Sequence, residues 1–174
     1  MNLYDILIAD NIVESINENL DYLLQIIPEI RYMIGFDHKH PHHHLDVWKH
    51  TLLALSNSQQ IFDVRLTLLL HDIGKPFSYQ TDGEIRHYKG HSEKSKIMAY
   101  EILKRLGYEE KYIEKICFYI ENHDTEIKDE LIKNNIKEAL TLFEVQQCDA
   151  LAHHPDKLEK RISYLTRTKK RLGI

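Results

Sequence analysis

Residues 64–75 read VRLTLLLHDIGK, and this stretch decides how the chain folds. Its first seven residues are apolar almost throughout, which predicts a buried segment. That segment ends on His71 and Asp72, and a buried carboxylate without a partner is costly. Imidazole and carboxylate both bind borderline divalent metals well, so a cation would meet that need. The alternative is a helix end whose His and Asp simply form hydrogen bonds.

The rest of the chain repeats the helical pattern. Apolar residues recur at spacings of three and four, and strand signals are nearly absent, which predicts an all-α fold. Gly74 and Pro76 should end the central helix. We expect further helices over residues 3–26 with a break near Asp10-Asn11, a helical turn over 28–35, and helices over 46–58, 92–106, 110–122, 136–152 and 155–172. The exception is the polar, turn-rich stretch 77–89, which predicts a small hairpin or an ordered loop.

The length and composition predict one domain. A chain of 174 residues can bury a substantial core, and 43% hydrophobic with 29% charged residues is ordinary for a globular protein. We expect a core over about 45–152, N-terminal helices over 3–34 and a basic C-terminal helix over 155–172. The oligomeric state stays open.

Nothing in the sequence predicts export or membrane insertion. No apolar stretch approaches the roughly 20 residues of a membrane span, and no basic region precedes an apolar run at the N-terminus. Cys117 and Cys148 lie in helical patterns and form no Cys-x-x-Cys pair, which fits a reducing compartment. We therefore expect a cytoplasmic protein.

Twelve histidines are many for this length, and some stand where packing alone would not place them. His123 extends an apolar stripe at a helix end, and Asp149 lies on the inner stripe of its helix, where a carboxylate is rare unless paired or metal-bound. His91 directly precedes an expected helix, and His50 lies within one. Each alone is more often an ordinary core or surface residue. Together they form a candidate metal-binding set of His50, His71, Asp72, His91, His123 and Asp149.

The order His…His-Asp…Asp in this set resembles the HD-domain superfamily of metal-dependent phosphohydrolases, over roughly residues 45–152. Three longer motifs make the resemblance more specific: LDVWKHT at 45–51, HDIGKP at 71–76 and GHS at 90–92. They resemble the HD region appended to some bacterial CCA-adding tRNA nucleotidyltransferases. No Gly-Ser with a nearby Asp-x-Asp is present, so nucleotide addition is not expected.

The resemblance implies an all-α HD bundle around a metal site. His50, His71, Asp72 and Asp149 match the four ligands of the family. His91 and His123 match the extra histidines of members with two metals, in which the motif Asp bridges. The implied cofactor is one or two divalent ions, with Mn, Ni, Co, Fe, Zn and Mg all open.

The resemblance also implies phosphoester hydrolysis by a metal-activated water. Asp72 would orient that water, and Lys75, which matches a basic residue often found after the His-Asp pair, would contact the phosphate. The alternative for Lys75 is a solvated loop position. His43 and His44, with His42 before them, are candidates for substrate contact or proton transfer. An exposed polar loop is the alternative for them.

The leading hypothesis is hydrolysis of nucleotide or RNA-end phosphoesters, either 2′,3′-cyclic phosphodiesters or phosphomonoesters. The alternatives are another HD nucleotidase, acting on a deoxynucleoside monophosphate, a dinucleotide or an alarmone, and a non-catalytic RNA- or nucleotide-binding module with a structural metal. A structural site needs no open coordination position. The net charge of −4 gives no general attraction to nucleic acid. The basic helix with Arg161, Arg167, Lys169, Lys170 and Arg171 is either an RNA contact or a solvated face.

Overall fold

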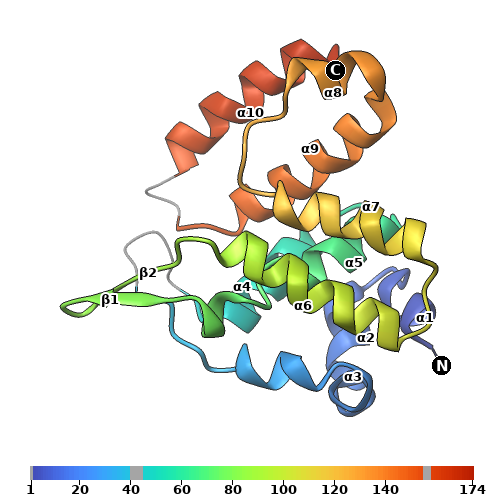
Figure 1. Cartoon of the computed structure of the whole chain (residues 1–174), viewed down its shortest axis with the longest axis vertical. Coiled ribbons are helices and arrows are strands. Elements are labelled where there is room, and N and C mark those ends of the chain that lie inside the picture. The colour runs from blue at the N-terminus through green and yellow to red at the C-terminus, as the bar shows by residue number, and fades with distance from the viewer. Residues whose placement is uncertain (1, 40–44, 155–157) are drawn as a thin grey trace.

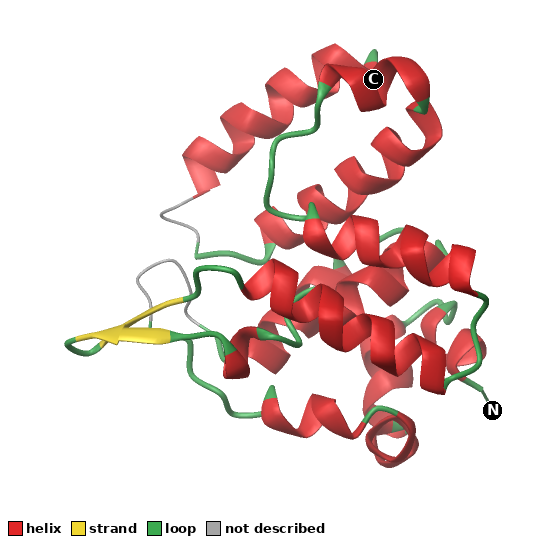
Figure 2. Cartoon of the chain, in the orientation of Figure 1, coloured by secondary structure: helices red, strands yellow, loops and turns green. Residues whose placement is uncertain are grey.

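The computed structural model describes residues 2–39, 45–154 and 158–174. Helices make up most of it, and the strands within these ranges form one small antiparallel hairpin (Figures 1 and 2). In chain order the elements are α1 (Leu3–Leu7), α2 (Ile12–Glu18), α3 (Leu20–Ile26), η1 (Pro28–Tyr32), α4 (Val47–Ser56), α5 (Phe62–Leu70), η2 (Lys75–Phe77), β1 (Gln80–Asp82), β2 (Ile85–His87), α6 (His91–Arg105), α7 (Glu110–Glu121), α8 (Asp129–Asn134), α9 (Ile136–Leu151) and α10 (Leu158–Leu172). The predicted helical fold with a hairpin inside 77–89 is confirmed.

Several boundaries differ from the expected ones. The N-terminal region forms three helices because Asn19, besides the break at residues 8–11, ends α2: its side-chain amide donates to the Ser15 carbonyl oxygen at 2.8 Å. The short helix α8 was not expected, and none of its residues is buried. Helix α10 turns Leu165 and Leu172 inward and leaves Ile162 exposed.

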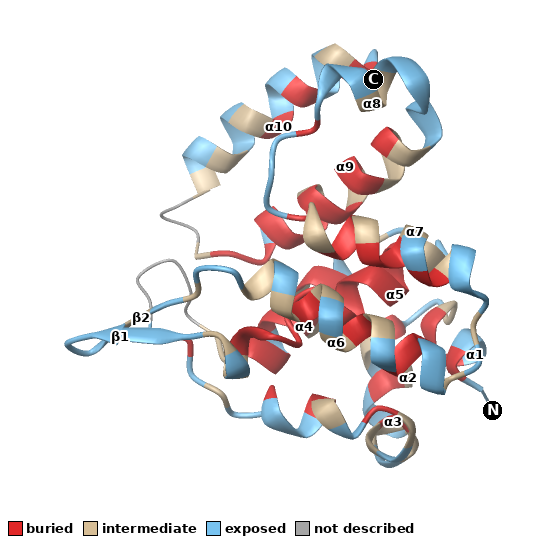
Figure 3. Ribbon diagram, in the orientation of Figure 1, coloured by how far each residue is buried: buried red, intermediate tan, exposed pale blue. Residues whose placement is uncertain are grey.

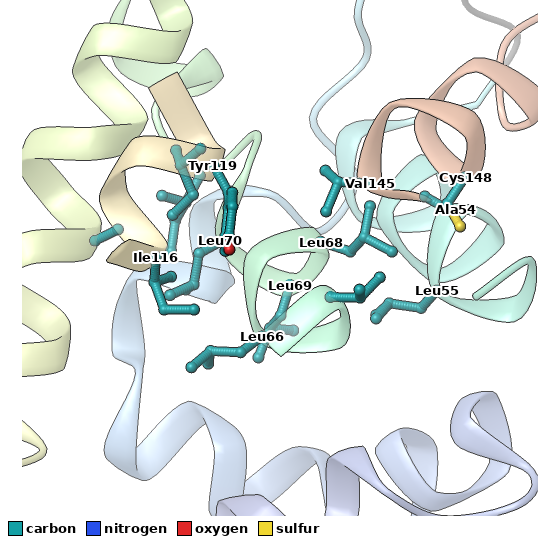
Figure 4. Close-up of a cluster of buried hydrophobic side chains, with 14 of the residues drawn as sticks. Ala54, Leu55, Leu66, Leu68, Leu69, Leu70, Ile116, Tyr119, Val145 and Cys148 are labelled. Atoms are coloured by element: carbon teal, nitrogen blue, oxygen red, sulfur yellow. The ribbon is translucent and has the colours of Figure 1, made fainter. Parts of the chain in front are cut away.

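Helix α5 is the centre of the core. Every residue from Val64 to Leu70 is buried, and α5 packs against α1, α4, α7 and α9 (Figure 3). In Figure 4 its leucines lie between Ile116 and Tyr119 of α7 on one side and Leu55 and Val145, from α4 and α9, on the other. This burial explains why residues 64–70 are apolar with little periodicity.

Arg65 is the charged residue among the buried residues of α5, and its guanidinium group forms several hydrogen bonds. Its guanidinium donates at 2.8 Å to the carbonyl oxygens of both Leu7 and Ala9, and at 3.1 Å to the Ser58 hydroxyl. The hydrogen bonds to α1 and the turn after it fasten the N-terminal helices to the central helix. A buried charge with this many hydrogen-bond acceptors is tolerated in the core.

The C-terminal helix α10 packs on α9 at the far end of the molecule from α3 (Figure 1). Arg171 holds it in place: its guanidinium lies 2.7 Å from Asp129 Oδ1 and 3.1 Å from Glu126 Oε1, and donates to the Ile127 carbonyl oxygen at 2.6 Å. The Arg171 side chain therefore serves mainly to hold α10 in place and is less available as part of a free basic surface. Among the described helices, none is long and apolar enough to cross a membrane.

Candidate metal centre

The six candidate ligands converge where several helices begin or end. His50 lies in the middle of α4 and Asp149 near the end of α9, while His71 directly follows α5 and precedes Asp72. His91 is the first residue of α6, rather than the residue before it, and His123 follows α7. The structure thus brings together all six residues that the sequence singled out.

On one side of Asp72 lie His50, His71 and Asp149. The Nε2 atoms of His50 and His71 lie 3.6 and 3.3 Å from Asp72 Oδ2. The same two nitrogens lie 2.8 and 3.5 Å from Asp149 Oδ1. Two imidazole nitrogens and two carboxylate oxygens therefore face a common point, as the ligands of one divalent ion would.

On the other side of Asp72 lie His91 and His123. Their Nε2 atoms lie 3.6 and 3.9 Å from Asp72 Oδ1, and 3.3 Å from each other. Asp72 thus presents one oxygen to each pair of histidines. This is the arrangement in which one carboxylate bridges two ions.

Backbone carbonyl groups orient these rings. The Nδ1 atoms of His71, His91 and His123 lie 2.7, 2.9 and 2.6 Å from the carbonyl oxygens of the residues three positions earlier. Such a contact requires a proton on Nδ1, so each neutral ring directs the lone pair of Nε2 at Asp72. This tautomer is the one that binds a metal through Nε2.

The centre holds buried polar atoms that lack a well-formed hydrogen bond. His71 Nε2 and both carboxylate oxygens of Asp72 have no hydrogen-bond partner, although all three are buried. Lys75 Nζ lies 2.6 Å from Asp72 Oδ2, but as an ion pair without hydrogen-bond geometry. Such groups are rare in a folded protein without a ligand. A divalent cation fits both their position and their chemistry.

Charge and burial set the protonation of the side chains at this centre. For His71 burial opposes the charged form, but Asp72 and Asp149 outweigh it and raise the pKa to about 10. For His123 burial, together with the charge on His71, lowers the pKa to about 4. Burial opposes ionisation of Asp72 too, but His71 and Lys75 hold the pKa of its carboxyl well below its usual range. A proton on His71 thus occupies the position that a cation would take.

Lys75 is not a solvated loop residue. Its side chain is buried between Asp72 and His38, whose Nε2 lies 3.4 Å from Lys75 Nζ. Its ammonium also lies 5.8 Å from the centre of the Tyr88 ring. Lys75 still borders the cavity at the metal centre, so the predicted contact with a phosphate is sterically open.

Sequence reasoning missed two histidines of this region. His153 lies one helical turn after Asp149, and its Nδ1 is 2.8 Å from the Asp149 carbonyl oxygen. Its spacing of four from Asp149 was a usable signal. His38 had no such signal, because its contact with Lys75 joins residues 37 positions apart. The predicted substrate-binding residues His43 and His44 lie outside the described residues.

The described residues form three groups that could hold an ion. Within each group the candidate ligand atoms lie within 4.8 Å of one another. The groups are His50 with His71 and Asp72, Asp72 with His91 and His123, and His50 with Asp149 and His153. The first two share Asp72, so they form a paired centre, and His153, two residues beyond the end of α9, extends it.

Comparison with known proteins identifies the family. A family model of the HD domain matches residues 42–166, and the chain therefore belongs to the HD domain family. Members of this family are typically metal-dependent phosphohydrolases. The resemblance read from the sequence motifs is confirmed.

One curated relative is similar over most of this chain. It is a CC-adding tRNA nucleotidyltransferase of Thermus thermophilus, 27% identical over 141 residues. The similarity covers 77% of this chain and 31% of the relative. The chain thus corresponds to about a third of the length of that protein.

Proposed function

We propose that this HD-domain protein hydrolyses nucleotide or RNA-end phosphoesters, either 2′,3′-cyclic phosphodiesters or phosphomonoesters. The observation that carries the proposal is the buried Asp72 carboxylate. It points one oxygen at His50 and His71 and the other at His91 and His123, with no hydrogen bond to satisfy either oxygen. Two-ion centres of this kind serve phosphoryl chemistry in many enzymes.

Different residues would hold the ions, orient the attacking water and neutralise the phosphate charge. His50, His71 and Asp149 would hold one ion, His91 and His123 the other, and Asp72 would bridge them. Bound ions supply a nucleophile at neutral pH and neutralise phosphate charge. Asp72 would also orient the attacking water. Lys75, held by Asp72 and His38, places a further positive charge on the cavity wall.

The space beside the centre supports a catalytic site over a purely structural one. A cavity of about 180 Å³ borders His91, His123 and Asp149, so these candidate ligands face open space as well as each other. A structural metal site is closed by its ligands. Room for a substrate at the ions is what hydrolysis requires.

The substrate class rests on the relative. The Thermus thermophilus protein is named for adding nucleotides to tRNA, and this chain matches part of it. A hydrolase of RNA-end phosphates would act on the same kind of molecule. Monoester and cyclic phosphate ends are both substrates that a two-ion centre with a nearby lysine can serve.

A turnover panel tests the proposal. Wild-type protein would be assayed with bis(p-nitrophenyl) phosphate, p-nitrophenyl phosphate and 2′,3′-cyclic AMP, each with Mn²⁺, Ni²⁺, Co²⁺ or Mg²⁺. We expect turnover that depends on added metal and is lost in Asp72→Ala. Lys170→Ala, a change on an exposed residue, is the matched control. No turnover of any phosphoester, or equal rates for wild type and Asp72→Ala, would refute the enzymatic proposal.

A further inference from the structure

A second and larger cavity adjoins the metal centre. Its volume is about 580 Å³, within the range of small-molecule sites. It shares His123, Asp124, Asp149 and Arg161 with the smaller cavity over the metal centre, so the two spaces meet beside the candidate ligands. Their combined space exceeds what a single phosphate group needs.

Helix α10 forms one wall of the larger cavity. Arg161, Tyr164 and Arg167, spaced three residues apart, all line it. Arg161 also borders the smaller cavity, on whose wall Lys75 lies, and its Nη1 is 4.0 Å from Asp149 Oδ2. One cation of the helix therefore reaches the metal centre, while Arg167 lies farther along the cavity.

Partly buried hydrogen bonds fix the position of this wall. Tyr164 donates its hydroxyl hydrogen to Gln146 Oε1 at 2.7 Å. The buried Gln146 amide donates in turn to the carbonyl oxygens of Asn122 and Thr125, at 2.9 and 2.6 Å. These two residues flank His123. The helix that carries the two arginines is thus linked, through Gln146, to the turn that carries a candidate ligand.

Acidic residues also line the larger cavity, and two of them have cationic neighbours. Glu126 lies 3.1 Å from Arg171, and Asp149 Oδ2 lies 4.0 Å from Arg161 Nη1. Asp124 is exposed to solvent. Glu159 is exposed at the surface. These neighbours reduce the acidic field in the cavity and favour an anionic occupant near Arg161 and Arg167.

We infer that α10 forms a subsite for two phosphate groups. This inference rests on the proposed function and narrows the substrate class of that function. Arg161 contacts the reacting phosphate beside Lys75, and Arg167 contacts a second phosphate of the same molecule. The rise of an α-helix places the two arginines about 9 Å apart along the axis, which is more than one phosphate spans. The preferred substrate is therefore an oligonucleotide end and not a mononucleotide.

Two cyclic substrates test this inference. One is 2′,3′-cyclic AMP, with one phosphate, and the other is the dinucleotide ApA ending in a 2′,3′-cyclic phosphate, with two. Arg161→Gln should lower kcat/KM at least tenfold on both, because a charge-assisted contact to the reacting phosphate is lost. Arg167→Gln should lower it about tenfold on the dinucleotide alone. Lys111→Gln, the same loss of a positive charge on an exposed residue of α7 outside both cavities, should leave both values within twofold.

The outcomes separate cleanly. Unchanged activity in Arg161→Gln, or equal losses on both substrates in Arg167→Gln, overturns the subsite. Equal losses in Lys111→Gln also overturn it, since they would reveal a general charge effect. Thermal melts check folding, and Arg161→Lys and Arg167→Lys, which keep the charge, should recover part of each loss.

A binding measurement keeps the subsite testable if the wild type turns over nothing and the proposed function fails. Calorimetry on the metal-loaded chain would use the product-like ligands 3′-AMP and ApAp. ApAp should bind about tenfold more tightly than 3′-AMP, and Arg167→Gln should abolish that difference. Equal affinities in the wild type, or no binding of either ligand, would overturn the subsite.

Discussion

The two oxygens of Asp72 face two different kinds of surroundings. Oδ2 faces His50 and His71, whose side chains are 1% and 0% exposed and whose neighbours are packed helices. Oδ1 faces His91 and His123, which stand at the start of α6 and just after α7, and the His91 side chain is 14% exposed. In the first half of the centre, His50 and His71 are enclosed in the core, whereas in the second half His91 and His123 border the cavity.

This difference in burial predicts that the two halves of the metal centre bind their ions with different affinities. Ligands that are locked by packing hold their geometry better than ligands at element ends. We therefore expect the ion beside His50 and His71 to bind more tightly, and the ion beside His91 and His123 to bind less tightly and to face the substrate.

The largest effect is expected from Asp72→Asn, which removes the charge that both halves share. Loss of both ions should follow, and activity should fall by more than about 100-fold, because even partners outside the ligand shell cost 10–100-fold. Elemental analysis and turnover measure the two effects. Retention of two ions in Asp72→Asn would show that the carboxylate does not bridge.

Removal of single histidines should separate the halves. Metal-reconstituted wild type should hold two ions per chain, and His91→Ala and His123→Ala should each hold one, because the first half is intact in both. His50→Ala is the contrasting variant and should lose the tighter ion. Elemental analysis measures all four proteins. One ion in wild type, His91→Ala and His123→Ala alike would refute the dinuclear centre and move both histidines to substrate binding.

A smaller effect is expected from Gly74→Ala, which should displace the His91 side of the metal centre relative to the His71 side. A methyl group there would lie 2.5 Å from the backbone nitrogen of Ser95 in α6, the helix that begins with His91. A backbone atom cannot rotate away from the new methyl group as a side chain could, so α6 must move. This movement should lower the free energy of unfolding by about 1–3 kcal/mol.

Metal titration of Gly74→Ala should show weaker binding of the second ion, with the first unchanged. Chemical denaturation of the metal-free chain measures the loss of stability. If both ions weakened equally, α6 would not position the second half alone.

The smallest effect is expected from a change of one pH unit. In the metal-free chain the pKa of His71 is about 10, above its ordinary value of 6.5. The stability that its proton contributes is fully present below pH 6.5 and is lost as the pH rises toward 10. A cation must displace this proton, so metal binding should strengthen by about 1.4 kcal/mol per pH unit within that window.

Thermal melts at fixed metal concentration check the sign of this effect. The difference in Tm between metal-loaded and metal-free protein should grow by about 3–5 °C per unit from pH 7 to pH 9. His71→Gln carries no titrating ring and should flatten the dependence. A difference in Tm that falls with rising pH would contradict the assignment of the proton to His71.

Much of the fold was predictable because it depends on local patterns. The apolar run before His71, the Asp82-Gly83 turn and Gly107 after α6 each specify their structure within a few residues. The extra break at Asn19 and the outward position of Ile162 were not predictable, since one depends on a side-chain hydrogen bond and the other on how α10 rotates against α9.

The sequence by itself determined the ligand types, the helical class and the family, because motif order and periodicity are properties of the chain. Only the tertiary structure decided that Asp72 turns one oxygen to each histidine pair, that His38 backs Lys75, and that Arg161 reaches the centre while Arg171 fastens α10. The physical reason is distance along the chain. These contacts join residues from different helices, and a side chain's partner there depends on how whole helices pack against one another.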